Sequence, residues 1–501
     1  MLVRVARANA LLVPAGAVIG IATSVLIARW LGPETYADYA TLLSILSWLL
    51  LLGESGCNTG LQRYFADVGK IHARRRFYDA LQWRRWGLVF VLSLGLSLLG
   101  PIWAAHASLP LERWGPLTFG LIGILAGATL HAQLATSALF ANFSHARAIT
   151  LASVMMVLRA VSLGLVCIYF REPVALVVAL LAVACVEAGF LHWIAIKQFS
   201  DERAKLPANI VNAAQRHGLV SLVDKISTAF TGGPFIILVL AAFHTRAELA
   251  VFAVASETLQ KLLAIIFLPI SNLVLPILNS SRDNPDRYVR QIERLGGAVT
   301  FMATISIGAI AAAIPSALPL LFGEAYAGAV PIALLWLAPL FIEAAVRMVW
   351  GASLLTLDQR SWLLVFNVVF GAVSLLAIFI FAHADLIVVV MVAGLIRIFG
   401  SGIVLMRAAR CGLLPAESRP LRILAVTVAA TVISWLGQSA LPSAPHLWRL
   451  SAGMGIYIVI IAVALRFLPL FPDRMHEVLR SLAGPYGPQL ARLIPRYWAQ
   501  K

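Results

Sequence analysis

The sequence predicts an all-α integral membrane protein with about 14 transmembrane helices. Of its 501 residues, 60% are hydrophobic and only 12% are charged, and the mean hydropathy is +0.88. A soluble domain carries about 25% charged residues, so this chain lacks the polar surface that solubility requires. Apolar stretches of roughly 20 residues, enough to cross about 30 Å of hydrocarbon, recur along the whole chain.

The positive charges follow the apolar stretches in a regular pattern. Most of the 39 Lys and Arg residues fall in alternate loops, beginning with the N-terminus, and cytoplasmic loops are enriched in these residues. The charge pattern therefore predicts cytoplasmic N- and C-termini, and one miscounted span would destroy it. The stretches are centred near residues 19, 48, 96, 127, 159, 185, 230, 263, 305, 342, 372, 396, 431 and 458, and the outside loops hold only Arg29, Arg113, Arg171, Arg246 and Arg449.

The first two spans form a predicted helical hairpin. They cover residues 9–30 and about 38–58, and the turn Leu31-Gly32-Pro33 between them is too short to hold a domain. The first apolar run is longer than the apolar region of a signal peptide, so we expect it to remain as a span.

The chain also repeats itself weakly. The motif AVSL at Ala160–Leu163 recurs at Ala372–Leu375, an offset of 212, and a similar offset sets Glu187 against Arg397. Two halves in the same orientation would be related by an axis along the membrane normal. We therefore expect an N-lobe over residues 1–205, a C-lobe over 206–410, two further spans over 411–468 and a basic cytoplasmic tail over 469–501.

Several functional classes find no support in the sequence. No Gly-x-x-x-x-Gly-Lys-Ser/Thr motif is present to cradle a nucleotide phosphate, so we expect any transport to be driven by gradients or membrane potential. The four cysteines show neither metal-ligand spacing nor a disulfide framework. The pI near 10.3 is explained by basic loops rather than by nucleic-acid binding. We expect no cofactor, no metal and no catalytic residues.

Arginines inside the spans are the first candidate functional residues. Inserting a charged side chain at the centre of a membrane helix costs about 2.5–3.5 kcal/mol on insertion scales. Such residues therefore usually face the protein interior or a water-filled cavity. Arg159 and Arg397 lie near the middles of spans five and twelve, without an acidic residue within one turn. Guanidinium groups suit a diphosphate or an acidic sugar. We expect a cationic cavity between the lobes, with a substrate-binding set of Arg159, Arg397, Arg347, Lys261, Arg29 and Arg63.

Acidic residues inside the spans allow two interpretations. Glu257 and Lys261 share one helix face, as do Glu343 and Arg347, so each couple can form an ion pair. Such pairs either hold the helices together or take part in transport. Similarly, two polar residues of span four either bind sugar hydroxyls or pack the helices. The predicted ion-coupling residues are Glu187, Glu257, Glu343 and Asp224, and the two polar residues are His131 and Gln133.

Three stretches carry a resemblance to a known family. Residues 27–39 read IARWLGPETYADY, residues 60–66 read GLQRYFA, and residues 321–329 read LFGEAYAGA. They resemble the ARxLGPxxYGxY, Gly…Arg-Tyr-x-Ala and FGxxYxxA elements of the O-antigen and exopolysaccharide flippases. These proteins form the polysaccharide branch of the multidrug/oligosaccharidyl-lipid/polysaccharide exporter superfamily. One departure is Ala37-Asp38, where the family usually has Tyr-Gly, which puts an acid in the outer turn.

The resemblance implies two six-helix lobes around a central cavity, two extra C-terminal helices, and alternating access in the bacterial inner membrane. It implies an undecaprenyl-diphosphate-linked oligosaccharide as substrate, contacts with membrane lipids, and polysaccharide polymerase or export machinery as partners. The Lipid II flippase branch is less similar, because its arginine-aspartate element in span one is missing here. The drug/cation antiporter branch usually has twelve spans and an acidic cavity.

We therefore predict a flippase for surface polysaccharide biosynthesis, which is not an enzyme and is coupled to protons or sodium. A drug or metabolite antiporter of the same superfamily is the alternative, and it predicts protection against cationic dyes without a glycan defect. A polymerase or glycosyltransferase is a third hypothesis, suggested by Glu34 and Asp38. Such membrane enzymes usually need a large outer loop to hold the sugar, and the predicted outer loops are all short.

Overall fold

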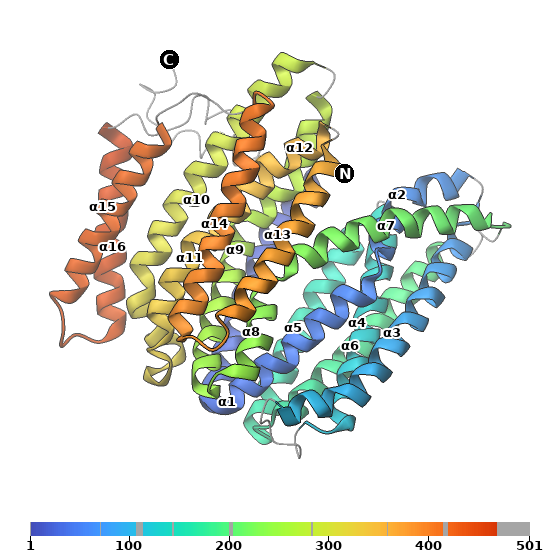
Figure 1. The fold of residues 1–501 in the computed structure, drawn as a ribbon, viewed down its shortest axis with the longest axis horizontal. Helices are drawn as coiled ribbons and strands as arrows, with labels where there is room; N and C mark the ends of the chain where they lie inside the picture. The colour runs from blue at the N-terminus through green and yellow to red at the C-terminus, as the bar shows by residue number, and fades with distance from the viewer. Residues whose placement is uncertain are drawn as a thin grey trace. The chain divides into compact units, whose positions relative to one another are not determined.

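The computed structural model describes residues 2–70, 72–106, 114–142, 145–199, 204–281, 284–357, 359–413 and 419–467. Within these ranges the protein is helical and contains no strands, which confirms the all-α class (Figure 1). Twelve of the described helices are long and apolar enough to cross a membrane, and one bent pair raises the number to thirteen. The predicted tail over 469–501 and the loop residue Arg113 lie outside the described residues.

The chain forms two compact units, which we describe separately. Unit 1 comprises Met1–Val254 and Leu364–Leu386, and unit 2 comprises Ala255–Leu363 and Ile387–Lys501. This division follows contacts and does not test the lobes expected from the sequence repeat, which stay a prediction. Unit 1 holds α1 (Leu2–Glu54), α2 (Cys57–Lys70), α3 (Arg74–His106), α4 (Pro116–Ala141), α5 (His145–Tyr169), α6 (Pro173–Gln198), α7 (Ala208–Ala229), α8 (Gly233–Phe243) and most of α13 (Arg360–Ile380). Unit 2 holds most of α9 (Arg246–Ser281), α10 (Pro285–Phe322), η1 (Glu324–Tyr326), α11 (Ala329–Val346), η2 (Arg347–Gly351), α12 (Ala352–Thr356), α14 (Leu386–Arg410), α15 (Arg419–Ser439) and α16 (His446–Phe467).

Helix α1 contains both arms of the predicted hairpin. It has 53 residues, which would measure about 80 Å as one straight helix, more than twice the hydrocarbon thickness. Gly32 interrupts it with φ 74° and ψ 170°, a conformation that favours glycine, and Pro33 follows at the start of the second arm. The described residues therefore hold twelve or thirteen candidate spans, close to the predicted fourteen, with both arms of α1 counted as one helix.

A second glycine position sets the contact between α2 and α7. Gly56 adopts φ 69° where α1 ends and α2 begins, and it lies against Gly218 of α7. A Cβ on Gly56 would lie 2.0 Å from the backbone carbonyl carbon of Gly218, and one on Gly60 would lie 2.4 Å from the carbonyl oxygen of Ala214. Small residues thus allow the two backbones to approach closely, as in many membrane helix pairs.

The apolar core of unit 1 lies where α2, α3, α4 and α6 meet. Phe65 of α2, Phe77 of α3 and Leu134 of α4 are fully buried there, together with Phe199 just after α6. The ring centroids of Phe65 and Phe199 are 5.4 Å apart, at an edge-to-face angle. This packing holds α2, α3, α4 and α6 against one another.

The seventh predicted span is broken rather than straight. Helices α7 and α8 meet at 51° around Gly232. Pro234 lies in the first turn of α8, where a missing N–H costs no helical hydrogen bond. The break leaves α8 with only 11 residues, too few to cross a membrane alone, so α7 and α8 qualify as a span only together.

In unit 2 the hairpin of α15 and α16 packs along α10 (Figure 1). Pro315 inside α10 has no N–H, so the carbonyl oxygen of Ala311, one turn earlier, loses its helical donor. The indole nitrogen of Trp435 donates to this oxygen at 2.9 Å. Gln438 of α15 donates to the next carbonyl, Ala312, at 2.7 Å. The C-terminal hairpin therefore supplies hydrogen bonds at the turn where the proline opens α10.

We expect Trp435→Phe to lower the stability of the protein by about 1 kcal/mol, because the freed carbonyl of Ala311 loses its buried partner. Thermal unfolding of the purified protein in detergent measures this change. Trp448, which is 68% exposed on α16, provides the matched control: Trp448→Phe is expected to unfold at the wild-type temperature. Equal unfolding temperatures for both variants would show that the indole hydrogen bond does not stabilise the helix.

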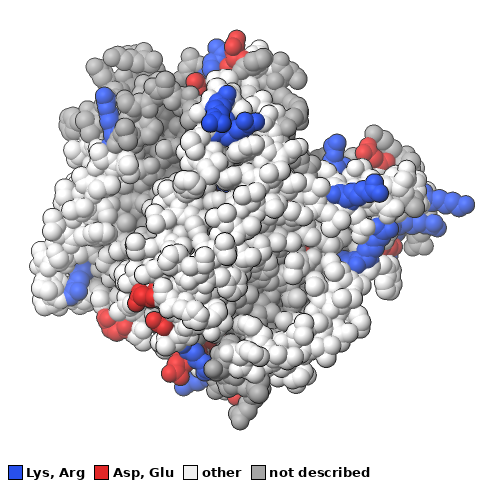
Figure 2. Space-filling model, in the orientation of Figure 1, with Lys and Arg blue, Asp and Glu red and all other residues white. Residues whose placement is uncertain are grey.

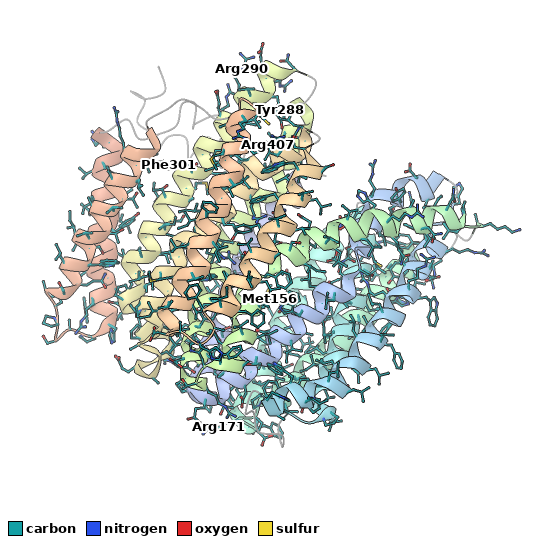
Figure 3. All side chains as sticks on the ribbon, in the orientation of Figure 1. Met156, Arg171, Tyr288, Arg290, Phe301 and Arg407 are labelled. Carbon is teal, nitrogen blue, oxygen red and sulfur yellow. The ribbon has the colours of Figure 1, made fainter. Side chains whose placement is uncertain are left out.

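On one face of the molecule, the charged side chains that reach the surface lie mostly near the helix ends (Figure 2). On the face drawn in Figure 2, the flanks of the helices are almost free of charge, as expected for surfaces that contact lipid. In unit 2, Arg290 of α10 and Arg407 of α14 lie at the same end (Figure 3). Arg407 stacks over Trp362 at 5.3 Å, and Trp is enriched at membrane interfaces.

Candidate functional site

A cluster of three charged residues lies inside unit 2. Glu343 of α11 accepts a hydrogen bond from Nε of Arg347 at 2.8 Å through Oε1, and its other oxygen accepts from Nη1 of Arg397 of α14. Both oxygens of one carboxylate are therefore occupied by two guanidinium groups. The predicted couple Glu343/Arg347 forms, and Arg397 joins it from another helix.

An aromatic ring and an unusual helical turn surround this cluster. The guanidinium carbon of Arg397 lies 4.6 Å from the ring centroid of Trp336, a cation–π contact. Arg347 begins η2, a π-helical turn within the membrane-spanning segment Ala329–Thr356. Single π-helical turns inside α-helices are frequent at functional sites.

The charges of this cluster do not cancel. One carboxylate faces two guanidinium groups, so the cluster carries a surplus positive charge in a low-dielectric span. The side chain of Arg397 is only 7% exposed and that of Glu343 10%, whereas that of Arg347 is 30% exposed. The buried pair can hold the helices together while Arg347 remains accessible to an anion.

A second pair in unit 2 also follows the predicted spacing. Nζ of Lys261 lies 3.4 Å from Oε2 of Glu257, one turn earlier on α9. Both side chains are partly exposed, so the pair adds little to stability. Glu257 and Lys261 therefore stay predicted ion-coupling and substrate-binding residues.

In unit 1, Arg159 forms an ion pair with a glutamate of a neighbouring helix. Nη2 of Arg159 on α5 donates to Oε2 of Glu187 on α6 at 2.9 Å. The sequence repeat sets Glu187 against Arg397, and each of these two residues forms an ion pair inside its own unit. If the predicted repeat holds, these two matching positions carry opposite charges.

Two further polar contacts connect helices of unit 1. Lys225 of α7 donates to both carboxylate oxygens of Glu54 at the end of α1, at 2.7 and 2.8 Å. The neighbouring Asp224 accepts a hydrogen bond from the side-chain amide of Asn367 of α13. Asp224 and Lys225 thus point to different helices, as their adjacency on α7 requires.

The remaining two predicted binding residues lie elsewhere. Arg29 is exposed near the kink of α1, and Arg63 is exposed on α2. The structure therefore joins Arg347 to Arg397 in one cluster but does not join Arg29 and Arg63 to each other. Their substrate contacts, like those of the other predicted residues, stay a prediction.

The structure shows how two residues of the family motifs are packed. Asp38, which departs from the family pattern, is 2% exposed, and its Oδ1 lies 3.8 Å from Nε of Arg246. Gly323 adopts φ 94° at the end of α10, and Tyr326 is buried directly after it. Burial raises the pKa of Tyr326 above its usual value. Asp38 and Tyr326 therefore have packing roles in their turns.

Sequence reasoning missed Arg85, a buried arginine of α3. It is 1% exposed and donates to the carbonyl oxygen of Leu130 at 2.5 Å and to Oδ1 of Asn58 at 2.8 Å. The charge pattern had placed this part of α3 in a cytoplasmic loop. The spacing of the buried residues could have shown that the helix begins earlier, since Phe77, Tyr78, Leu81, Gln82, Arg85 and Val89 repeat every three or four positions.

No group of three or more His, Cys, Asp or Glu residues that could hold a metal ion occurs in the described ranges. The charged clusters consist instead of guanidinium, ammonium and carboxylate groups, whose chemistry is ion pairing and anion binding.

Two of three comparisons relate the chain to known proteins. Residues 7–281 match the model of a family described as polysaccharide biosynthesis protein. A comparison with curated proteins finds no match. Among solved structures, the Lipid II flippase MurJ in an inward closed conformation has a TM-score of 0.72 at 12% identity, covering 90% of this chain and 97% of that one.

Two MATE transporters have a similar fold. An inward-facing multidrug resistance MATE family transporter of the MOP superfamily has a TM-score of 0.65 at 14% identity, covering 80% of this chain and 96% of that one. A point mutant of the MATE transporter VcmN of Vibrio cholerae has a TM-score of 0.58 at 14% identity, covering 81% and 98%. These low identities support the fold, and the family match covers more than half of the sequence. The chain belongs to the polysaccharide biosynthesis protein family, and its fold is similar to those of the flippase MurJ and of the MATE transporter.

Proposed function

We propose that this protein is a flippase that moves an oligosaccharide linked to undecaprenyl diphosphate across the bacterial inner membrane for surface polysaccharide biosynthesis. The family carries the description polysaccharide biosynthesis protein, and one solved structure with a similar fold is that of a Lipid II flippase. These two findings support transport of a glycan lipid rather than enzymatic chemistry.

The observation that carries the proposal is the surplus positive charge formed by Glu343, Arg347 and Arg397 inside the membrane-spanning part of unit 2. A diphosphate must lose part of its hydration to cross the hydrocarbon. Guanidinium groups bind it in two-point contacts and replace that hydration. The polyprenyl tail can remain in lipid while the charged head crosses.

The same observation argues against the antiporter alternative. A cationic drug gains nothing from a site with two arginines and one glutamate, whereas an anionic headgroup does. A membrane enzyme would need groups that perform chemistry on the sugar. The acids that suggested one are Glu34 and Asp38, and Asp38 is buried in its turn beside Arg246.

The remaining features of the proposal follow from the charge pattern and the family. The two lobes rock around a central cavity, and the two termini face the cytoplasm. A polysaccharide polymerase or export complex receives the flipped glycan at the outer leaflet. The proposed substrate-binding set includes Arg159 of unit 1 and Lys261 of unit 2 as well as the arginines of the cluster.

Deletion of the gene tests this function. We expect the deletion to abolish the surface polysaccharide and to raise the amount of lipid-linked oligosaccharide on the cytoplasmic leaflet, and the wild-type gene to restore both. Arg159→Ala at wild-type protein level is expected to resemble the deletion. Normal surface polysaccharide in the deletion strain, together with a new sensitivity to cationic dyes, would instead support the antiporter.

A further inference from the structure

Two helices of unit 1 are joined by an arginine that the ion pairs described above do not include. Nη2 of Arg84 on α3 donates to Oδ1 of Asn212 on α7 at 3.1 Å, and its Nη1 donates to Oε1 of Gln215 on the same helix. Arg216 follows Asn212 by four residues and therefore lies on the same face of α7. Both arginines are exposed. We call Arg84, Asn212, Gln215 and Arg216 the α3/α7 site.

The contacts within the α3/α7 site do not neutralise its positive charge. Asn212 and Gln215 are neutral amides, so their oxygens hold the guanidinium group of Arg84 in place without cancelling its charge. Helix α2 packs beside α7, and Figure 2 shows basic side chains gathered over this end of unit 1. The site therefore presents positive charge outward from a cross-helix contact of fixed geometry.

The α3/α7 site lies where the surface of both helices changes from polar to apolar. On α3, residues 87–105 carry no charge, and the exposed side chains among them are apolar. On α7, Arg216 is followed on the exposed surface by Leu219, Val220 and Val223. The surface of a membrane helix changes in this way near the lipid headgroups, because charged side chains are costly in the hydrocarbon. The two arginines therefore lie near the headgroup level.

Two tryptophans of α3 support this level. Trp83 is 77% exposed and Trp86 is 39% exposed, and they lie on either side of Arg84 in the sequence. Tryptophan is enriched where the hydrocarbon meets the headgroups, because its ring is apolar and its N–H can donate a hydrogen bond. The two exposed rings thus indicate that Arg84 lies at the depth of lipid phosphate groups.

We propose that the α3/α7 site binds the phosphate of an anionic phospholipid in the leaflet at this end of unit 1, which the charge pattern predicts to be cytoplasmic. Arg84 and Arg216 donate hydrogen bonds to the phosphate oxygens. Trp83 packs beside the glycerol group, and an acyl chain lies along Leu219 and Val220. The binding is noncovalent and does not depend on the proposed flippase function.

A resident phospholipid fits this site better than the diphosphate lipid of the proposed function. Both guanidinium groups are exposed, so a bound phosphate keeps part of its hydration and stays at the headgroup level. Residues 60–85 carry seven basic and two acidic residues. Basic clusters next to a membrane span attract anionic phospholipids, by about fivefold in affinity for each positive charge.

Native mass spectrometry of the purified full-length protein in detergent tests the site. We expect the wild type to bind phosphatidylglycerol more tightly than phosphatidylcholine, whose headgroup has no net charge. Arg84→Gln and Arg216→Gln should each weaken the binding of phosphatidylglycerol about fivefold. Arg76→Gln is the matched control, because it removes an exposed positive charge about 12 Å nearer the start of α3. This variant should keep the wild-type affinity.

Thermal unfolding in detergent separates binding from folding. Arg216 is exposed, so Arg216→Gln without added lipid should unfold at the wild-type temperature. Added phosphatidylglycerol should raise the unfolding temperature of the wild type and of Arg76→Gln, since a ligand that binds the folded protein stabilises it. The same addition should raise the unfolding temperature of Arg216→Gln by much less.

Equal binding of phosphatidylglycerol and phosphatidylcholine by the wild type would overturn the site, and so would wild-type affinity for phosphatidylglycerol in both Arg84→Gln and Arg216→Gln. Undecaprenyl diphosphate is the third lipid probe. If these two variants lost its binding and kept that of phosphatidylglycerol, the assignment to a resident phospholipid would be wrong. Normal polysaccharide in the deletion strain would instead overturn the flippase function and leave the phospholipid site standing.

Discussion

Arg347→Ala and Arg397→Ala should each abolish the surface polysaccharide while the protein level stays at that of the wild type. Either change leaves one arginine against Glu343 and so removes the surplus positive charge of the cluster. A charge-assisted hydrogen bond contributes about 1.5–3 kcal/mol, so each variant should lose roughly tenfold to a hundredfold in affinity for a diphosphate. Quantitative immunoblots for the protein and an assay of the cell-surface glycan measure the two outcomes.

A double variant distinguishes the effect of the surplus positive charge from the effect of losing the buried ion pair. Glu343→Gln with Arg397→Met removes both members of the pair and keeps Arg347 as a lone positive charge. We expect this variant to export much more glycan than Arg397→Ala, in which the carboxylate of Glu343 neutralises the remaining arginine. Normal polysaccharide in both single alanine variants would remove the cluster from the site.

Gly218→Leu should prevent the folded protein from accumulating. A Cβ at position 218 would lie 2.2 Å from the carbonyl oxygen of Gly56, closer than atoms of real side chains approach. The backbones of α2 and α7 would have to separate, and overpacking of this kind costs about 3 kcal/mol or more. Membrane-fraction immunoblots and thermal unfolding in detergent measure the effect.

Gly189 on α6 provides the matched control. A Cβ there would meet no atom within 4 Å, and the position is exposed on a membrane span. Gly189→Leu should therefore accumulate and unfold like the wild type, and leucine is also the better helix former. If Gly218→Leu were as stable as Gly189→Leu, the close contact between α2 and α7 would be wrong.

Much of the fold follows from the sequence because hydropathy reports burial in lipid directly. The kink at Gly32 lies in the predicted turn, since glycine and proline there allow little else. The break between α7 and α8 was not predicted. A bend of 51° depends on how the helix packs, and the hydropathy of residues 209–243 does not encode it.

Some ion pairs of the candidate site could likewise be predicted from the sequence, and others could not. The pairs Glu257/Lys261 and Glu343/Arg347 were predicted, because residues four apart on one helix must share a face. The partners of Arg159 and Arg397 were not, since they come from other helices and depend on tertiary packing. The two arginines appeared isolated along the chain, although each has an acid across a helix interface.

Binding of undecaprenyl diphosphate to the purified protein tests the central claim most directly. Native mass spectrometry in detergent can compare this lipid with undecaprenyl monophosphate and with a cationic dye, for the wild type and for Arg347→Ala. We predict that the wild type binds the diphosphate lipid most tightly and that Arg347→Ala loses this preference. Equal binding of the diphosphate lipid by both proteins, or a wild-type preference for the dye, would contradict the account.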